Sequence, residues 1–255
     1  MPLERKHVLI TVKTYPTPSK TYIETVCCAG IDLDTGSWIR LYPVPFRDLD
    51  RSRQFKKYDI IEVKCEKAPK DHRVESYHID QGSIKVLGHL DSKQKWRKRA
   101  EIILPTASPS FCHIQSKTAE NVSLGTFKPS RIGFLCKKAE AADDGKRQAC
   151  YMQLTFFDRR KNVIEKVPYD FYYEFHCAGE DACPGHRLKI IDWELGQAYR
   201  KWREETRSAA ELLEKIRQKW LVEIYSERND VYFYVGNMHV FRDQFLVLGV
   251  FYPKK

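Results

Sequence analysis

The chain has 255 residues, of which 42% are hydrophobic and 13% aromatic, a composition typical of a folded globular protein with one large domain or two smaller ones. It carries 44 Lys and Arg against 34 Asp and Glu, a formal net charge of +10. No apolar run approaches the roughly 20 residues of a membrane-spanning helix, and the first residues lead into an apolar strand without the hydrophobic region of a signal peptide. We therefore expect a cytoplasmic protein with no membrane partner, and the basic charge favours DNA or RNA as its ligand over plain solubility.

The first third of the chain alternates apolar and polar residues in short runs, as strands do. The predicted strands are 7–14, 22–31, 37–42, 58–64 and 74–79, with a turn at 34–36 that joins the second and third as a hairpin. Five short strands in this order predict a small barrel of the OB type over residues 1–88. Residues 89–126 are less regular, and a basic helix at 93–101 followed by two prolines predicts a linker or insertion.

Residues 127–255 repeat the strand pattern, with predicted strands at 131–137, 149–157, 169–177, 231–238 and 245–252. Between the third and fourth of these lie a Cys/His loop at about 176–187 and a helical segment at about 188–225. A break in this segment is expected near Ser208, which with Glu211 resembles a capping box. We therefore predict a mainly β protein with α insertions, built as two OB-like barrels.

The loop places Cys177, Cys183 and His186 close together in sequence, and thiols with imidazole are ligands that zinc prefers. A tetrahedral ion needs a fourth ligand, for which the sequence leaves His176, Asp192 and Cys150 open. We expect a structural zinc ion that ties the strand end to the helix start. The alternative interpretation is two reduced thiols beside an unrelated histidine.

Motifs for catalysis are absent from the sequence, since it contains no phosphate-binding loop, serine-hydrolase elbow or HExxH zinc motif. Asp192 and Glu194 are weak catalytic candidates. With the Cys/His loop they leave a metal-dependent nuclease open as an alternative. Asp192 is also well placed as a helix N-cap, so we favour a protein without enzymatic activity.

OB barrels bind single strands by stacking bases on aromatic side chains while Lys and Arg follow the phosphates. If Ile39 and Leu41 face the first core, then Trp38, Arg40 and Tyr42 share the opposite, ligand-binding face. In the alternative interpretation these are ordinary half-buried aromatic residues and a solvated or paired arginine. A separate alternative is a protein-interaction adaptor, whose basic surface only keeps it soluble and whose apolar patch would lie along the helix that carries Trp202 and Trp220. The predicted nucleic-acid contacts are Lys13, Tyr15, Lys20, Trp38, Arg40, Tyr42, Arg47, Lys56 and Lys57.

Five segments together resemble an uncharacterised bacterial family that contains a dual OB domain. They are 24–31 (ETVCCAGI), 38–47 (WIRLYPVPFR), 54–59 (QFKKYD), 192–194 (DWE) and 234–239 (YVGNMH). The similarity spans the whole chain. It implies the OB fold and, by analogy, nucleic-acid binding as an accessory module beside a nuclease or helicase in genome defence.

Overall fold

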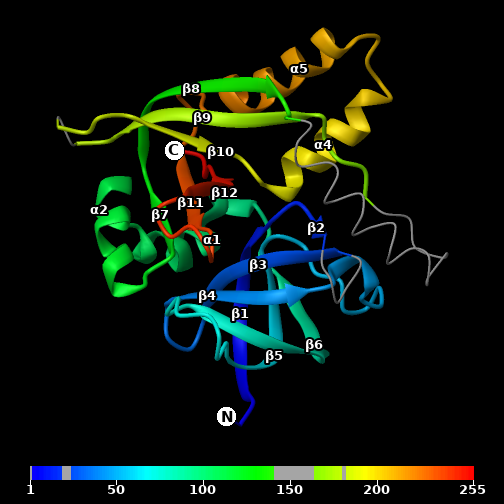
Figure 1. Ribbon diagram of the computed structural model, residues 1–255, viewed down its shortest axis with the longest axis vertical. Coiled ribbons are helices and arrows are strands. Elements are labelled where there is room, and N and C mark those ends of the chain that lie inside the picture. The colour runs from blue at the N-terminus through cyan, green and yellow to red at the C-terminus, as the bar shows by residue number, and fades with distance from the viewer. Residues whose placement is uncertain (1, 19–23, 141–163, 180–181) are drawn as a thin grey trace.

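The computed structural model describes residues 2–18, 24–140, 164–179 and 182–255. The chain is mainly β and forms two units that follow one another along the long axis of the molecule, the first in blue and cyan at the bottom of Figure 1. In the part of the chain that the structure describes, no helix combines the length and apolar character needed to cross a membrane.

The first unit is a closed barrel of five main strands. In chain order they are β1 (Glu4–Lys13), β3 (Glu24–Asp32), β4 (Trp38–Val44), β5 (Asp59–Lys67) and β6 (Ser76–His89), with β2 (Thr17–Pro18) paired to β3 at one edge. The barrel closes because β1 pairs with both β3 and β5, β3 pairs with β4, and β6 lies between β4 and β5. The β4–β6 pairing is parallel and the others are antiparallel. The five strands predicted for this unit are confirmed in their order.

The second unit contains two three-stranded sheets, with strand orders β10-β9-β8 and β12-β11-β7. An isolated parallel bridge between Ile190 and Val247 links β10 to β12. Aromatic side chains fill the space between the sheets, and the Tyr173 and Phe233 rings stack at 4.5 Å. The strands are β7 (Leu124–Phe127), β8 (Pro129–Lys138), β9 (Tyr169–Cys177), β10 (His186–Lys189), β11 (Tyr232–Asn237) and β12 (Phe245–Phe251).

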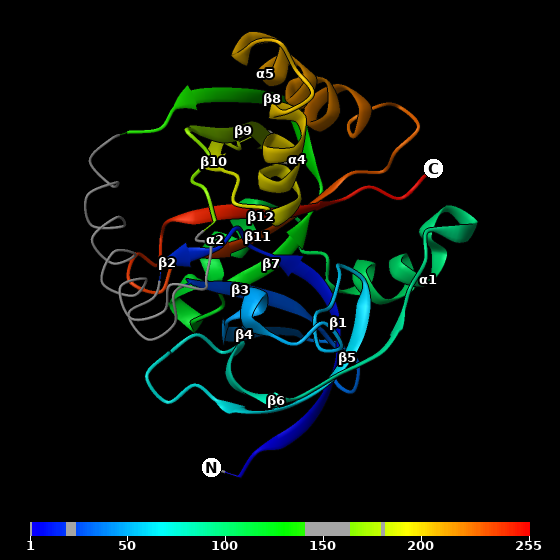
Figure 2. The same cartoon turned by 90° about the vertical axis from the view of Figure 1, so that its right-hand side faces the viewer.

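Helices follow the strand β10 and cover one side of the second core (Figure 2). Asp192 Oδ1 accepts the Glu194 backbone N–H at 3.0 Å and so caps the first helix. The predicted break is confirmed, because Ser208 Oγ accepts the Glu211 N–H at 3.2 Å while the Glu211 carboxylate accepts the Arg207 N–H. These helices are α4 (Trp193–Arg203) and α5 (Ala209–Arg217), followed by a π-helical turn, η5 (Gln218–Glu223).

The region predicted as a linker, 89–126, contributes elements to both units. Its helices are α1 (Lys93–Ile103) and α2 (Phe111–Ser116), and its short 3-10 turns are η2 (Leu104–Thr106) and η3 (Lys117–Glu120); a further turn, η1 (Phe46–Asp48), follows β4. The strand β7 at the end of this region pairs with β11 and is therefore part of the second unit.

Two predictions for the second unit are not confirmed: one falls on residues that the structure does not describe, and the other needs correction. The predicted strand 149–157 falls outside the described residues. The Cys/His loop does not run directly into a helix, because the strand β10 lies between them and pairs with β9. The loop is thus a connection between two neighbouring strands of one sheet.

The two units meet across an apolar interface that forms a third hydrophobic cluster. Leu9, Val12 and Tyr58 of the first unit pack in this cluster with Tyr234 and Phe251 of the second. The burial of these apolar side chains between the two units favours a single arrangement of the units. Part of the outer surface of the first barrel is therefore buried by the second unit.

Candidate metal centre and neighbouring surfaces

Three cysteines and one histidine converge at the end of the second core. Cys112 comes from α2, Cys177 from the last residue of β9, Cys183 from the loop and His186 from the first residue of β10. Their ligand atoms all lie within 4.8 Å of one another, and Cys177 and Cys183 are buried. This group can hold a metal ion.

Four separations between the ligand atoms come close to the edges of a tetrahedral site. The Cys112 and Cys177 sulfurs are 3.7 Å apart, and His186 Nε2 lies 3.3, 3.7 and 3.2 Å from the sulfurs of Cys112, Cys177 and Cys183. A tetrahedron with metal–sulfur bonds of about 2.3 Å and metal–nitrogen bonds of about 2.0 Å has edges of about 3.5 to 3.8 Å. The side chains therefore already stand where such an ion would need them.

Local structure positions Cys112 and His186. Ser110 Oγ accepts the His113 N–H at 3.0 Å and caps α2, which brings Cys112 onto the first turn of the helix. The helix packs closely on β7 because Gly125 has no side chain; a Cβ there would lie 2.6 Å from Ile114. The Phe111 ring packs edge-on against the His186 imidazole, with the two ring centres 4.7 Å apart, and this contact restricts the orientation of the imidazole.

The charge state of the cluster depends on whether a cation is bound. Burial raises the pKa of the Cys112 and Cys177 thiols, so both are neutral without a positive charge beside them. For Cys183 burial acts in the same direction, but the backbone N–H groups of Cys177 and Gly185 outweigh it and lower the pKa. A bound divalent ion would supply the charge that three thiolates require.

Three of the four ligands were predicted from the sequence, and the fourth was not. His176 lies outside the cluster because it points to the opposite side of β9 from Cys177. Asp192 lies past the far end of β10, where it caps α4, and Cys150 is outside the described residues. Cys112 takes the fourth position, and no spacing motif in the sequence connects it to the loop.

Asp192 and Glu194 belong to a different place, a pocket of about 310 Å³ between the two units. Lys57 Nζ donates to Glu194 Oε2 at 3.1 Å and to the Val250 carbonyl at 3.2 Å. Burial raises the pKa of Asp192 to about 7. The group formed by Cys112, Cys177, Cys183 and His186 includes neither Asp192 nor Glu194, so among the described residues the predicted nuclease centre that joins these acids to the Cys/His loop is not assembled.

The first-barrel surface predicted to bind nucleic acid is largely covered by the second unit. Arg40 is 3% exposed, and its Nη2 donates to Ser123 Oγ at 3.0 Å. Trp38 packs edge-on against Tyr234 at 5.6 Å. The alternation correctly placed Ile39 and Leu41 in the core, but Arg40 on the opposite face meets protein instead of solvent and is not accessible to a ligand.

Most of the other predicted contact residues are engaged within the protein. Lys13 Nζ lies 3.8 Å from the centre of the Phe46 ring, and the Tyr15 hydroxyl donates to the Glu165 carbonyl at 2.7 Å. Arg47 pairs with Glu24 at 2.6 Å. Tyr42 and Lys56 are exposed, and Lys20 lies outside the described residues. The predicted set therefore does not form one continuous open surface.

The adaptor hypothesis placed an apolar patch near Trp202 and Trp220. These two rings instead pack against each other edge-on at 6.0 Å, and Trp220 is 6% exposed. Trp220 on η5 is thus part of the second core, and Trp202 on α4 packs against that core.

A basic surface lies on the sheet β10-β9-β8, on the side that faces away from the core. Its centre is Tyr172 on β9, and the Lys189 backbone lies directly opposite in β10. Two ion pairs cross this face, Arg187 with Glu174 at 2.6 Å and Lys189 with Asp170 at 2.7 Å. We call it the β9 face; its residues are Arg131, Lys137, Asp170, Tyr172, Glu174, His176, Arg187 and Lys189.

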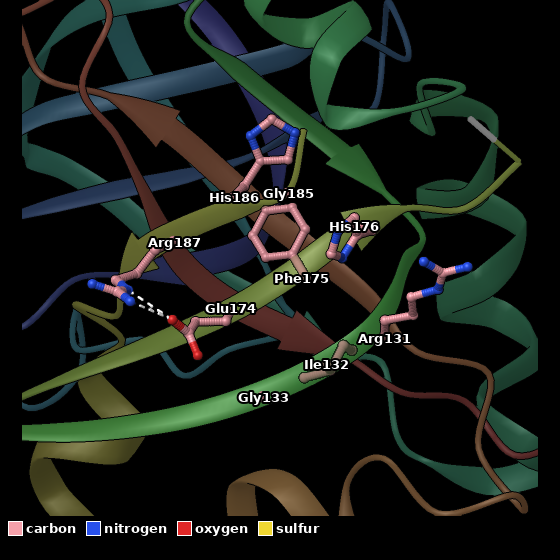
Figure 3. Close-up of a pocket in the computed structure, with 9 residues that line it drawn as sticks. All are labelled: Arg131, Ile132, Gly133, Glu174, Phe175, His176, Gly185, His186 and Arg187. Atoms are coloured by element: carbon pink, nitrogen blue, oxygen red, sulfur yellow. Dashed lines mark hydrogen bonds and ion pairs between the residues drawn. The ribbon is translucent and has the colours of Figure 1, made fainter. Parts of the chain in front are cut away.

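The β9 face includes a hollow of about 560 Å³ (Figure 3). Arg131 and His176 lie toward one end of the hollow and the Arg187–Glu174 pair toward the other. The metal ligand His186 also lines it. The candidate metal centre thus borders the hollow through His186.

Two families match the chain in sequence, both described as domains of unknown function. One, DUF8758, matches residues 4–105, and the other, DUF8757, matches residues 107–255. The chain belongs to the DUF8757 family. The DUF8757 segment contains all four ligands of the candidate metal centre, while the DUF8758 segment contains the closed barrel. No curated protein matches the chain.

Proposed function

We propose that this protein binds single-stranded nucleic acid on the β9 face, and that a structural zinc ion at Cys112, Cys177, Cys183 and His186 maintains the shape of that face. The observation that carries the proposal is the order in which the strands of each unit pair. That order identifies the part of each barrel that contacts ligands in OB folds.

Both units pair their strands in the order of an OB barrel. Counting β1, β3, β4, β5 and β6 as strands one to five, the first unit pairs one with two, two with three, three with five in parallel, and four with both five and one. The second unit repeats these pairings, with β7 and β8 together as strand one and the Ile190–Val247 bridge as the parallel contact. This agreement supports two OB-like barrels.

In OB folds, oligonucleotides lie across the second and third strands. In the first unit these are β3 and β4, whose outer side is buried against the second unit around Arg40. In the second unit they are β9 and β10, which carry Tyr172, Arg187 and Lys189. The second barrel is therefore the one whose ligand-binding strands face solvent.

The chemistry of the β9 face suits a single strand. Tyr172 offers a ring on which a base can stack, and the Lys137 ammonium lies 6.0 Å from the centre of that ring. Arg131, Arg187 and Lys189 add positive charge to the same face, while Asp170, Glu174 and the nearby Glu140 carry negative charge. Exposed ion pairs such as Arg187–Glu174 contribute about 0–1 kcal/mol, so their cations can turn to phosphates at little cost. The net charge of +10 attracts a polyanion to the molecule.

Zinc is the ion that best fits the metal centre. Three thiolates and one imidazole in tetrahedral positions are a zinc donor set, and four protein ligands leave no position for a reacting water. Such an ion would tie α2 to the ends of β9 and β10 and so hold the floor of the hollow. Its role is structural, which removes the metal from any hydrolytic mechanism.

The decisive experiment is fluorescence anisotropy with a labelled 15-nucleotide oligo-dT, its RNA counterpart and a duplex, each titrated over a salt series. We expect the single strands to bind more tightly than the duplex and the affinity to fall steeply with salt. Tyr172→Ala should weaken binding about 5- to 150-fold, because stacking contributes about 1–3 kcal/mol per base. Lys137→Ala should weaken binding less and should reduce the salt dependence.

Tyr42→Ala is the matched control, since it removes an exposed tyrosine from the first barrel. Its affinity should equal that of the wild type. Binding that Tyr42→Ala weakens and Tyr172→Ala does not would move the site to the first barrel. No binding of any oligonucleotide at low salt would refute the proposed function.

A further inference from the structure

A second group of metal-ligand residues lies away from the cysteines, where a loop of each unit meets the other. Asp71 and His72 belong to the connection between β5 and β6, and His239 to the connection between β11 and β12. One ligand atom from each lies within 4.8 Å of the others. Side chains that are distant in sequence thus converge on one point at the junction of the units.

Two contacts show how the group is arranged. His239 Nδ1 lies 3.2 Å from Asp71 Oδ1, and the His72 and His239 rings stack with their centres 5.4 Å apart. His72 Nε2 is buried, and none of the described residues forms a hydrogen bond with it. This nitrogen can therefore act as a ligand without breaking a contact among those residues.

We propose that Asp71, His72 and His239 form a site for a divalent transition-metal ion, separate from the Cys/His centre. Two imidazoles and one carboxylate are a donor set that Zn²⁺, Co²⁺, Ni²⁺ and Fe²⁺ accept, and three protein ligands leave positions for water or an anionic ligand. A neutral imidazole has one ring nitrogen without a proton, so His239 can present Nδ1 to the ion while Nε2 carries the proton.

The charged residues around Asp71, His72 and His239 weaken the affinity of this group for a metal ion but hold its side chains in position. Arg73 donates to both Asp71 oxygens, with Nη2 at 2.6 Å from Oδ2, and its Nη1 donates to the Asn237 carbonyl at 3.0 Å. Arg242 is a second cation near His72. These charges oppose a metal ion, so we expect weaker binding here than at the three thiolates. The Arg73 contacts also hold the two loops together, which preorganises the ligands.

The test is a titration of the zinc-loaded protein with Co²⁺, followed by calorimetry and absorption spectroscopy. We expect one further equivalent of Co²⁺ to bind with weak d–d bands and without the intense sulfur-to-cobalt charge-transfer bands of a thiolate site. His239→Ala should weaken this binding at least tenfold. Its side chain is 47% exposed, so its removal leaves the fold intact. His78→Ala, which removes an exposed histidine from β6, is the matched control and should bind like the wild type.

Three results would overturn the proposal. They are no uptake of Co²⁺ beyond the zinc, uptake that His239→Ala leaves unchanged, and uptake that shows charge-transfer bands, which would mean exchange into the Cys/His centre. None of these results depends on oligonucleotide binding, so this site and the proposed function are tested separately.

Discussion

Asp192 stabilises the start of α4, and its burial makes ionisation of its carboxyl group less favourable. It is 5% exposed, it caps α4, and it shares the pocket between the units with Lys57 and Glu194. Burial is the largest influence and raises its pKa to about 7, although the Lys57 ammonium opposes this. Ionising the carboxyl therefore works against the folded state.

Replacing Asp192 with Asn should change how stability depends on pH. The folded protein holds the Asp192 proton up to about pH 7, whereas the unfolded chain releases it near its ordinary pKa of 3.8. The stabilisation is complete below pH 3.8 and is lost as the pH rises through 7, by up to about 4 kcal/mol. Urea unfolding of wild type and Asp192→Asn from pH 4 to 8 measures this, since Asn can still cap the helix.

The expected result is a wild type that loses stability relative to Asp192→Asn as the pH rises. Equal slopes for the two proteins would show that Asp192 titrates at its ordinary pKa in the folded state.

The same scale shows what the sequence can and cannot predict about a site. Cys177, Cys183 and His186 were predicted because they are neighbours in sequence as well as in space. Cys112 lies 65 residues before Cys177, and only the packing of α2 on β7 brings it to the loop. For Arg40, strand alternation predicted which face it occupies, but nothing local predicts that another part of the chain covers that face.

At the scale of elements, β9 links the metal centre to the proposed binding surface. Its alternating side chains send Phe175 and Cys177 into the core and the ligand cluster, and Tyr172, Glu174 and His176 to the β9 face. A change in the position of the β9 end would therefore alter both sides of the strand together.

We expect removal of the metal to destabilise this part of the protein. Cys112→Ser should reduce the bound zinc from one equivalent and lower the thermal midpoint, because metal binding contributes directly to folding free energy. Cys136→Ser is the matched control, since it changes a partly buried cysteine on β8 outside the ligand group. Elemental analysis with thermal unfolding, with and without a chelator, makes the measurement. Purified protein without bound metal, and with equal midpoints for both variants, would contradict a structural zinc ion.

The elements differed in how well the sequence predicted them, for a physical reason. The strands of the first barrel and β12 are long enough for alternation or apolar runs to appear, and the Ser208–Glu211 cap has a local sequence pattern. β7 and β10 have four residues each, too few for a period to be recognised. They exist because pairing with β11 and β9 satisfies their backbone groups.

At the scale of the whole molecule, polar groups buried between the units add to the apolar interface. Glu75 accepts the backbone N–H of Ser123 at 2.8 Å and its hydroxyl at 2.8 Å, and that hydroxyl in turn accepts from Arg40 Nη2. Glu75 and Arg40 are 6% and 3% exposed. Each buried charge depends on partners across the interface, so separation of the units would expose an apolar cluster and disrupt this network at once.

The two units should therefore unfold together, despite matching two separate families. We expect one calorimetric transition for the chain, with equal van't Hoff and calorimetric enthalpies. Arg40→Ala should lower its midpoint by the equivalent of about 3–5 kcal/mol, because it leaves Glu75 buried beside an incomplete network. Arg53→Ala removes an exposed arginine whose ion pair with Asp50 is at the surface, and it should change stability by less than about 1 kcal/mol. Two separate transitions, only one of which moves in Arg40→Ala, would mean that each barrel is stable without the other and that the interface contributes little to either.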